Sequence, residues 1–284
     1  MGRNMLKFVS NCNLFMVAPA RTGLTSLPSL VEFQKLSSIG GSCFLISDHR
    51  PYYIKHAYRC YEDFYSRHFL APQLAALGSG FQFMKPWNIR IHGSHISIGE
   101  NAHIVTARDR RVCLSTWTHG EHQGHINIGN QCLLCPGVRI ESASEVRIGD
   151  NCMIAAGAYL TDADWHDLYD RTQPVGNTKP IVLHDNVWVA AGATICKGVS
   201  IGHNSIVAAA SVVVADIAPN TIAAGNPARE VKQLDDTSPM ITRADLFANP
   251  SEKAKDLDEI DRYLLRDNSL INWLRHLFVP RQGD

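Results

Sequence analysis

A repeat of six residues dominates the stretch between residues 183 and 227. Aliphatic residues recur at every sixth position, and four positions after each stands another apolar or small residue: Leu183, Val189, Ile195, Ile201, Val207 and Val213, followed by Val187, Ala193, Val199, Ser205, Ser211 and Ile217. A helix turns by about 100° per residue, so its sixth residue faces elsewhere. A two-sided strand would repeat every second residue. The period instead predicts a coil of very short parallel strands, in which both recurring positions point inward and stack on the next coil.

The same pattern resembles that of the hexapeptide-repeat acyltransferases. The ending AGNPAREVKQL is similar to the close of the coil in the galactoside, maltose and polysaccharide O-acetyltransferases. The resemblance covers roughly residues 96–233 and implies a mainly β fold, namely a left-handed parallel β-helix, which is an exception to right-handed crossovers. It also implies acetyl-CoA as the donor, and a homotrimer whose active sites lie between neighbouring coils.

The repeat divides the chain into three predicted parts. Residues 86–234 form the β-helix domain. Within it, Leu160 and the next in-phase residue, Leu183, are 23 positions apart where six was expected, so about 17 residues are inserted. This insertion places a loop at 161–182, and loops of this length are usually functional or disordered. Residues 1–85 form an N-terminal segment and residues 235–284 a C-terminal linker with helices.

Both terminal segments contain predicted helices. Apolar residues spaced three to four apart between Ile54 and Phe69 predict an amphipathic helix that ends at Ala71-Pro72. Near the C-terminus, the apolar residues between Leu270 and Phe278 predict a helix capped near Asn268-Ser269 and stopped before Pro280. Packing on the protein itself is the simpler role for these helices, and peripheral contact with a membrane is the alternative.

Composition limits the function classes and the compartment. The 284-residue chain has a formal net charge of zero, so no basic excess predicts nucleic-acid binding. No run of about 18 apolar residues predicts a transmembrane helix. Polar residues interrupt the apolar core that a secretory signal would need near the N-terminus. Cys132 and Cys152 occupy inward positions of the repeat, so their thiols are explained by packing. We expect a cytoplasmic protein, with the inner face of the membrane as an alternative location.

A polar interruption of the coil contains His119, His122 and His125. Three histidines can bind zinc, and the carbonic anhydrases with a left-handed β-helix use three. On an exposed, glycine-containing loop they are more often solvated, so we expect no metal.

His166, in the inserted loop, is the predicted catalytic residue. A saccharide hydroxyl is a poor nucleophile toward a thioester, and a neutral imidazole can take its proton as attack begins. In the resembling acetyltransferases, a histidine in the loop just before the repeat that begins at Ile181 is the general base. A carboxylate could orient its ring, and the candidates are Asp162, Asp164 and Glu141.

The remaining candidate residues divide into acceptor and donor contacts. Acceptor contacts are predicted for Trp165, Tyr169, Arg171 and the outward Trp188. For the donor, small residues at adjacent turns leave backbone exposed to the pantetheine arm, and basic positions after the coil match those that hold the phosphates of coenzyme A in the family. The donor set is Ala190, Ala191, Gly192, Lys197, Ala208, Ala209, Asn226, Arg229 and Lys232.

These features together predict an acetyl-CoA-dependent O-acetyltransferase acting on a hydroxyl of a saccharide or saccharide-linked acceptor. Acetyl-CoA is the expected co-substrate. The alternatives are an N-acyltransferase of an amino sugar, a zinc-dependent enzyme of the carbonic-anhydrase type, and a non-catalytic β-helix scaffold.

Overall fold

The computed structural model describes residues 48–120, 122–235, 237–248 and 250–281. They belong to two compact units. One unit runs from Glu62 to Ala244, and the other combines the described residues up to Tyr61 with those from Asp245 onward.

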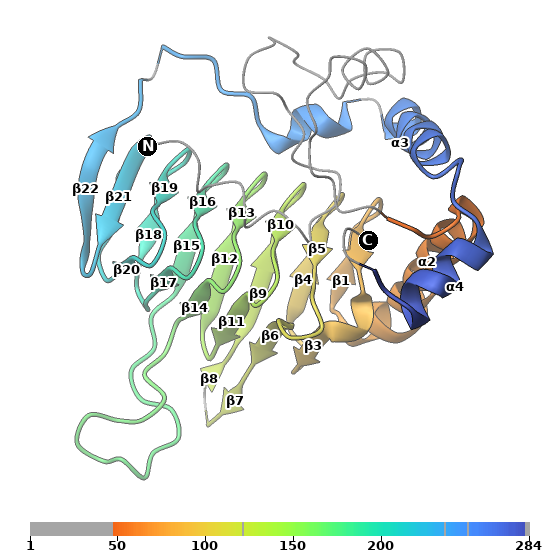
Figure 1. Ribbon diagram of the computed structural model, residues 1–284. Helices are drawn as coiled ribbons and strands as arrows, with labels where there is room; N and C mark the ends of the chain where they lie inside the picture. The colour runs from red at the N-terminus through yellow and green to blue at the C-terminus, as the bar shows by residue number, and fades with distance from the viewer. Residues whose placement is uncertain (1–47, 121, 236, 249, 282–284) are drawn as a thin grey trace. The chain divides into compact units, whose positions relative to one another are not determined.

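The unit from Glu62 to Ala244 is a coil whose turns build three sheets (Figure 1). The first sheet contains β1 (Ala76–Leu77), β4 (Ile96–Ile98), β9 (His125–Ile128), β12 (Glu145–Ile148), β15 (Ile181–Leu183) and β18 (Ser200–Ile201). The second contains β2 (Gln82–Met84), β5 (His103–Val105), β10 (Leu133–Leu134), β13 (Met153–Ile154), β16 (Trp188–Val189), β19 (Ile206–Val207), β21 (Thr221–Gly225) and β22 (Ala228–Gln233). The third contains β3 (Ile89–His92), β6 (Val112–Thr116), β11 (Arg139–Ser142), β14 (Tyr159–Thr161), β17 (Thr194–Ile195) and β20 (Val212–Val213).

The strands pair in parallel from coil to coil, and the inward residues stack in columns. In the third sheet, for example, Leu160 lies opposite Ile195 and Ile195 opposite Val213. The six recurring aliphatic residues from Leu183 to Val213 are at most 1% exposed. The inward positions predicted from the period of six are therefore confirmed, because side chains of one coil bury those of the next. Cys132 and Cys152 are also fully buried in this core.

Two details mark the ends of the coil. Strands β1 and β2 precede residue 86, the predicted beginning of the β-helix domain, and pair with β4 and β5. At the other end, β22 runs antiparallel to β21. An antiparallel strand closes the stack because it does not lead into a further coil.

The corner between the first and second sheets is a column of left-handed residues, mostly asparagine: Asn101, Gln131, Asn151, Asn186, Asn204 and Asn220, with φ between 53° and 62°. Asparagine tolerates this conformation better than most residues. The side-chain amide of Asn186 donates to Asn204 at 2.9 Å, and that of Asn204 donates to Asn220 at 2.8 Å. The turns that the repeat predicts are thus joined by hydrogen bonds along the coil.

The corner between the second and third sheets, here called the glycine corner, contains Gly137, Gly157, Gly192 and Ala210, all with positive φ. The N–H group of each of the last three donates to the preceding coil, at 2.9–3.0 Å. Ala210, at φ 57°, is the only member of this column that carries a Cβ.

Exchanging residues at equivalent positions of the glycine corner should change stability in opposite directions. A Cβ built on Gly157 meets nothing within 4 Å, so Gly157→Ala adds no clash and only the strain of φ +71°. The left-handed conformation costs alanine about 1–2 kcal/mol, partly offset by the entropy that glycine loses on folding. We expect urea unfolding to show Gly157→Ala about 0.5–1 kcal/mol less stable and Ala210→Gly more stable by a similar amount. Equal signs for the two substitutions would contradict this account.

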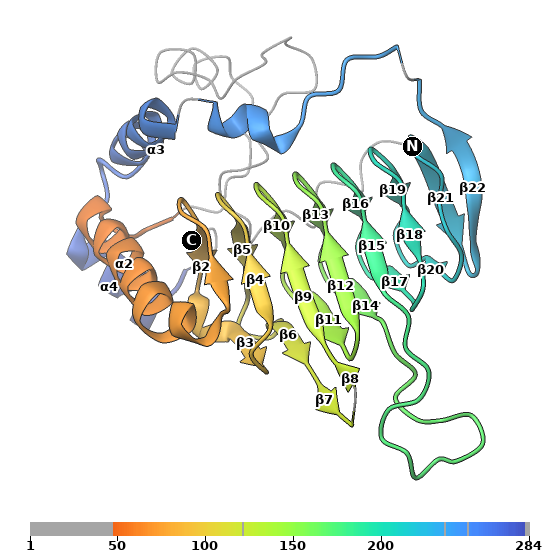
Figure 2. The same cartoon turned by 180° about the vertical axis from the view of Figure 1, so that it is seen from behind.

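The third corner, here called the arm corner, joins the third sheet to the first and carries both large excursions of the coil. One is the hairpin of β7 (Thr118–His119) and β8 (His122–Gln123). The other is the segment 162–180, here called the arm, which leaves between β14 and β15 and extends from the same edge in both views (Figures 1 and 2). Insertions are tolerated here because they leave the strand pairing on either side intact.

The other unit is built from helices. The predicted N-terminal helix is α2 (Tyr52–Tyr65), which starts in this unit and continues beyond Glu62 into the coil unit as a π-helical turn, Ser66–Leu70. The C-terminal helices are α3 (Pro250–Leu264) and α4 (Leu270–Phe278). Ser269 caps α4 by accepting from Asn272 N at 3.2 Å, which confirms the predicted cap. None of the described helices is long and apolar enough to span a bilayer.

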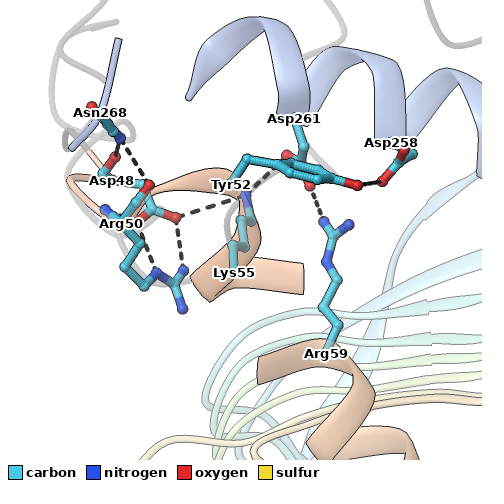
Figure 3. Close-up of polar contacts among 8 residues, drawn as sticks. All are labelled: Asp48, Arg50, Tyr52, Lys55, Arg59, Asp258, Asp261 and Asn268. Carbon is cyan, nitrogen blue, oxygen red and sulfur yellow. Dashed lines mark hydrogen bonds and ion pairs between the residues drawn. The ribbon is translucent and has the colours of Figure 1, made fainter. Parts of the chain in front are cut away.

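Helices α2 and α3 are held together by ion pairs and hydrogen bonds (Figure 3). The carboxylate of Asp261, 1% exposed, accepts from Lys55 at 2.9 Å and also from Arg59. The hydroxyl of Tyr52 donates to Asp258 at 2.6 Å. The amide of Asn268 donates to the carbonyl of Arg50 at 2.9 Å. These contacts join residues about 200 positions apart in the chain, since Tyr52 and Asp258 are separated by 206.

Candidate functional site

The arm has a defined structure at its base. Asp164 N donates to Asn177 O at 2.9 Å, and Gly176 N donates back to Asp164 O at 2.8 Å. Lys179 N donates to Asp162 O at 2.9 Å. A Cβ added to Gly176 would lie 2.5 Å from the carbonyl oxygen of His166, so the two sides of the arm approach closely there. These contacts fix the backbone that carries His166.

His166 is exposed on this arm, and its Nδ1 lies 3.3 Å from the carbonyl oxygen of Gln173. A carbonyl can only accept, so Nδ1 must be the protonated nitrogen in this contact. In a neutral ring, Nε2 is then left with a lone pair. The arm therefore holds His166 with Nε2 as the unprotonated nitrogen of the neutral ring.

Two aspartates shape the tip of the arm. Asp167 Oδ1 accepts from the N–H groups of Asp170 and Tyr169, both at 2.9 Å, and these bonds lower the pKa of Asp167. Hydrogen bonds from the Thr172 hydroxyl and the Gln173 amide lower the pKa of Asp170 in the same way. Because Gln173 Nε2 donates to Asp170 Oδ2 at 3.1 Å, this turn also positions the residue whose carbonyl holds His166.

The three predicted orienting carboxylates have other partners. Asp162 is fully buried and accepts from the Ser142 hydroxyl at 2.7 Å and the Ala143 N–H at 2.7 Å. Burial raises the pKa of Asp162, while these hydrogen bonds act in the opposite direction. Asp164 pairs with Lys197 at 2.5 Å. Glu141 accepts from Tyr159 at 2.5 Å and pairs with Arg139. The Gln173 carbonyl, which no sequence pattern indicates, contacts the imidazole instead.

An aromatic pair joins the arm to the neighbouring hairpin. The indole of Trp165 donates to Thr161 Oγ1 at 3.1 Å, and its ring centroid lies 5.7 Å from that of Trp117. Trp117 in turn lies 5.1 Å from His92, measured between ring centroids. Trp117 was not predicted as a site residue, because only the fold brings it to the same corner as Trp165.

The other predicted acceptor contacts lie apart from this pair. Tyr169 is 97% exposed at the tip of the arm. Arg171 Nε donates to the carbonyl of Leu168 at 3.2 Å, so it stabilises the tip. Trp188 is 40% exposed in β16, which belongs to the second sheet.

The predicted donor residues other than Lys197 lie at the glycine corner and at the end of the coil. Ala191, Gly192 and Ala209 are exposed, while Ala190 and Ala208 are half-buried. The carbonyl of Ala191 accepts from Ala210 N, so this part of the backbone is used within the coil and the open surface consists of small side chains.

The basic candidates differ in their surroundings. Asn226, Arg229 and Lys232 are exposed at the closing strands, and Arg229 donates to the carbonyl of Ala228 at 2.8 Å. Lys197 instead contacts the arm through Asp164. Lys197 therefore anchors the base of the arm to the coil.

The three histidines of the polar interruption lie at the arm corner and in the strand that comes after it. His119 and His122 lie in the hairpin, and His125 begins β9, with its ring centroid 4.8 Å from that of His95. Within the described ranges, no group of three or more His, Cys, Asp or Glu residues is arranged to hold a metal ion.

Comparison with known proteins identifies the repeat. Residues 146–162 and 180–215 match the family model described as the hexapeptide repeat of succinyl-transferase. With the parallel three-sheet coil, this match establishes the left-handed parallel β-helix expected from the sequence. The chain is 34% identical to the galactoside O-acetyltransferase of Escherichia coli over 114 residues, which is 39% of this chain and 56% of that enzyme.

Solved structures with similar folds are hexapeptide-repeat and related acyltransferases. A variant of AntD, an N-acyltransferase from Bacillus cereus in complex with a dTDP-amino sugar and coenzyme A, is 20% identical, with a TM-score of 0.49 over 60% of this chain and 89% of that one. The acetyltransferase VCA0836 from Vibrio cholerae, complexed with acetyl-CoA, is 24% identical, with a TM-score of 0.38 over 64% and 89%.

The match to sequence relatives is partial. The chain spans 56% of the length of the Escherichia coli enzyme and 59% of a Saccharomyces cerevisiae relative to which it is 34% identical over 115 residues. The terminal helices lie outside the matched family model.

Proposed function

We propose that this chain, a member of the hexapeptide-repeat acyltransferases, transfers an acetyl group from acetyl-CoA to a hydroxyl of a saccharide or saccharide-linked acceptor. One observation carries the proposal: the arm before β15 holds His166 through Nδ1 and leaves Nε2 available. The likeness to galactoside O-acetyltransferase supports the reaction class.

His166 acts as the general base. Its Nε2 accepts the proton of the acceptor hydroxyl while the oxygen attacks the acyl carbonyl carbon. Acetyl-CoA supplies the thioester, whose C–S bond breaks as the new C–O ester bond forms. The imidazolium then gives its proton to the departing thiolate, and the Gln173 carbonyl keeps Nδ1–H in place throughout. No covalent acyl-enzyme is needed.

The donor lies along the glycine corner in this proposal. A Cβ built on Gly192 meets nothing within 4 Å, so an extended chain can approach the backbone of the corner there. Arg229 and Lys232 contribute positive charge for the phosphates near the closing strands. In a homotrimer, the arm of one subunit brings His166 to the coil of the next.

The acceptor contacts centre on Trp165 and Trp117. Their rings, 5.7 Å apart, provide apolar faces on which a saccharide can stack. Tyr169 and Arg171 add contacts from the tip of the arm.

The test is thiol release from acetyl-CoA with a panel of neutral, amino and phosphorylated saccharides. We expect turnover with at least one hydroxyl acceptor and a product that hydroxylamine cleaves, because an ester is labile and an amide is not. A hydroxylamine-stable product would show N-acylation instead. A protein that neither binds coenzyme A nor turns over would be a scaffold and would refute the proposal.

A further inference from the structure

A depression of 590 Å³ opens at the glycine corner, near the first coils. The loop 108–111, Cys113 and the two glycines Gly137 and Gly157 line it. The loop joins β5 to β6, whereas the closing strands lie at the opposite end of the second sheet.

The arginine-bearing loop is held in one shape. Ala107 N donates to Arg110 O and Arg110 N donates to Ala107 O, both at 3.2 Å, which closes a tight turn around Arg108 and Asp109. Before the turn, the buried hydroxyl of Thr106 donates to the carbonyls of Met84 and Lys85 at 3.0 and 2.8 Å. The guanidinium groups therefore project from a backbone that is fixed at both sides.

The loop 108–111 carries three arginines and one aspartate, Asp109, so its net charge is positive. Arg108, Arg110 and Arg111 are exposed, and within the described part of the chain none of them lies within 4.0 Å of a carboxylate. Two other arginines of the coil differ, since Arg139 in β11 pairs with Glu141 and Arg147 in β12 pairs with Glu145. Like charges crowded on a short turn repel one another, and an anion bound among them would remove that repulsion.

The floor of the depression is open to a ligand. A Cβ placed on Gly137 would lie 3.7 Å from Arg110 Cβ, so Arg110 lies next to this glycine. A Cβ on Gly157 would meet nothing, so the floor beyond Arg110 is unobstructed backbone. Backbone without side chains beside guanidinium groups suits a compact, strongly charged group such as phosphate.

We propose that Arg108, Arg110 and Arg111 bind a phosphate or diphosphate group carried by the acceptor. The assignment rests on the proposed acetyl transfer and narrows its substrate to phosphorylated saccharides. Planar guanidinium groups bind phosphate in two-pronged contacts that ammonium groups cannot match.

The geometry favours the acceptor over coenzyme A as the source of this phosphate. Strand β6 leads from Cys113, in the depression, to Trp117 beside the arm, a span of about 13 Å at 3.3 Å per residue. Arg229 and Lys232, in β22, stand six strands from β5 in the second sheet, about 29 Å at 4.8 Å per strand. A phosphorylated saccharide can therefore reach the aromatic pair from the depression while the donor phosphates occupy the other end.

The experiment measures the binding of inorganic pyrophosphate and of coenzyme A by calorimetry at low ionic strength. The variants are Arg108→Ala, Arg110→Ala, Arg111→Ala and the triple replacement, with Arg147→Ala as a control on the first sheet. We expect each single variant to weaken pyrophosphate binding about tenfold and the triple variant more than 100-fold, because each removes a charge-assisted contact. The arginine variants should keep the wild-type Kd for coenzyme A. The Arg147→Ala control should keep the wild-type Kd for pyrophosphate.

Two outcomes overturn the assignment. Pyrophosphate that binds the triple variant as well as the wild type, or binds neither, removes the anion site. Coenzyme A affinity that falls with the triple replacement assigns the depression to the donor. These binding measurements do not depend on turnover. If the protein shows no acetyl transfer but binds pyrophosphate through the arginines, the proposed function is refuted and the anion site is still supported. In an active enzyme, the triple variant should raise KM for a sugar phosphate and leave KM for acetyl-CoA unchanged.

Discussion

Replacing His166 by alanine is expected to lower kcat for acetyl transfer by about 10²–10⁴-fold, the contribution of a positioned general base. The side chain is exposed and contacts the Gln173 carbonyl on the arm, so its removal leaves no buried group unsatisfied. The Kd for coenzyme A should therefore stay the same. Thiol release and calorimetry on the same preparations measure the two quantities.

The matched control for this variant is His203→Ala. His203 is also exposed and also lies in a turn of the coil, but at the corner between the first and second sheets. We expect its kcat to remain within twofold of the wild type. If the His166 variant keeps wild-type turnover, His166 is not the base. If both variants lose activity together with the far-ultraviolet circular dichroism of the coil, the loss reflects folding.

Asp261→Ala is expected to destabilise the packing of α2 against α3 by about 3–5 kcal/mol, the usual cost of removing one partner from a buried ion pair. Asp261 is 1% exposed and Lys55 only 14% exposed, so the variant leaves the ammonium of Lys55 largely desolvated. Asp48, 3.7 Å from Lys55, compensates in part and places the cost toward the lower end. Hydrogen exchange of the amides in α2 and α3 measures the loss of protection.

Asp267→Ala provides the comparison, because the Asp267 side chain is 87% exposed and, among the residues that the structure describes, forms an ion pair with its neighbour Arg266 alone. Surface substitutions of this kind usually change stability by less than about 0.5 kcal/mol. Protection of α2 and α3 should be the same as in the wild type. Unchanged protection in Asp261→Ala as well would mean that the ion pair does not contribute to holding these helices together.

The repeat made most of the coil predictable. Each inward residue, such as Ile195, contacts the same position of the next coil, so a local period of six describes contacts that repeat along the whole domain. The insertion before β15 appears in the sequence as a break in that period, and His166 lies within it. The cap of α4 was predictable for a similar reason, since Ser269 and Asn272 are only three residues apart.

The amino-acid sequence by itself therefore determined the coil, its inward columns, the position of the arm and the identity of the candidate base. Only the tertiary structure decided what surrounds that base, namely the Gln173 carbonyl at Nδ1 and Trp117 beside Trp165, and it alone brought Arg110 next to Gly137 at another corner. Every residue has a backbone carbonyl, so the residue type of Gln173 does not predict its role. Contacts made by the insertions, unlike those between the strands, follow no period. Those features depend on the corner of the coil at which each insertion is located. The stacking of the coils determines which insertions lie side by side.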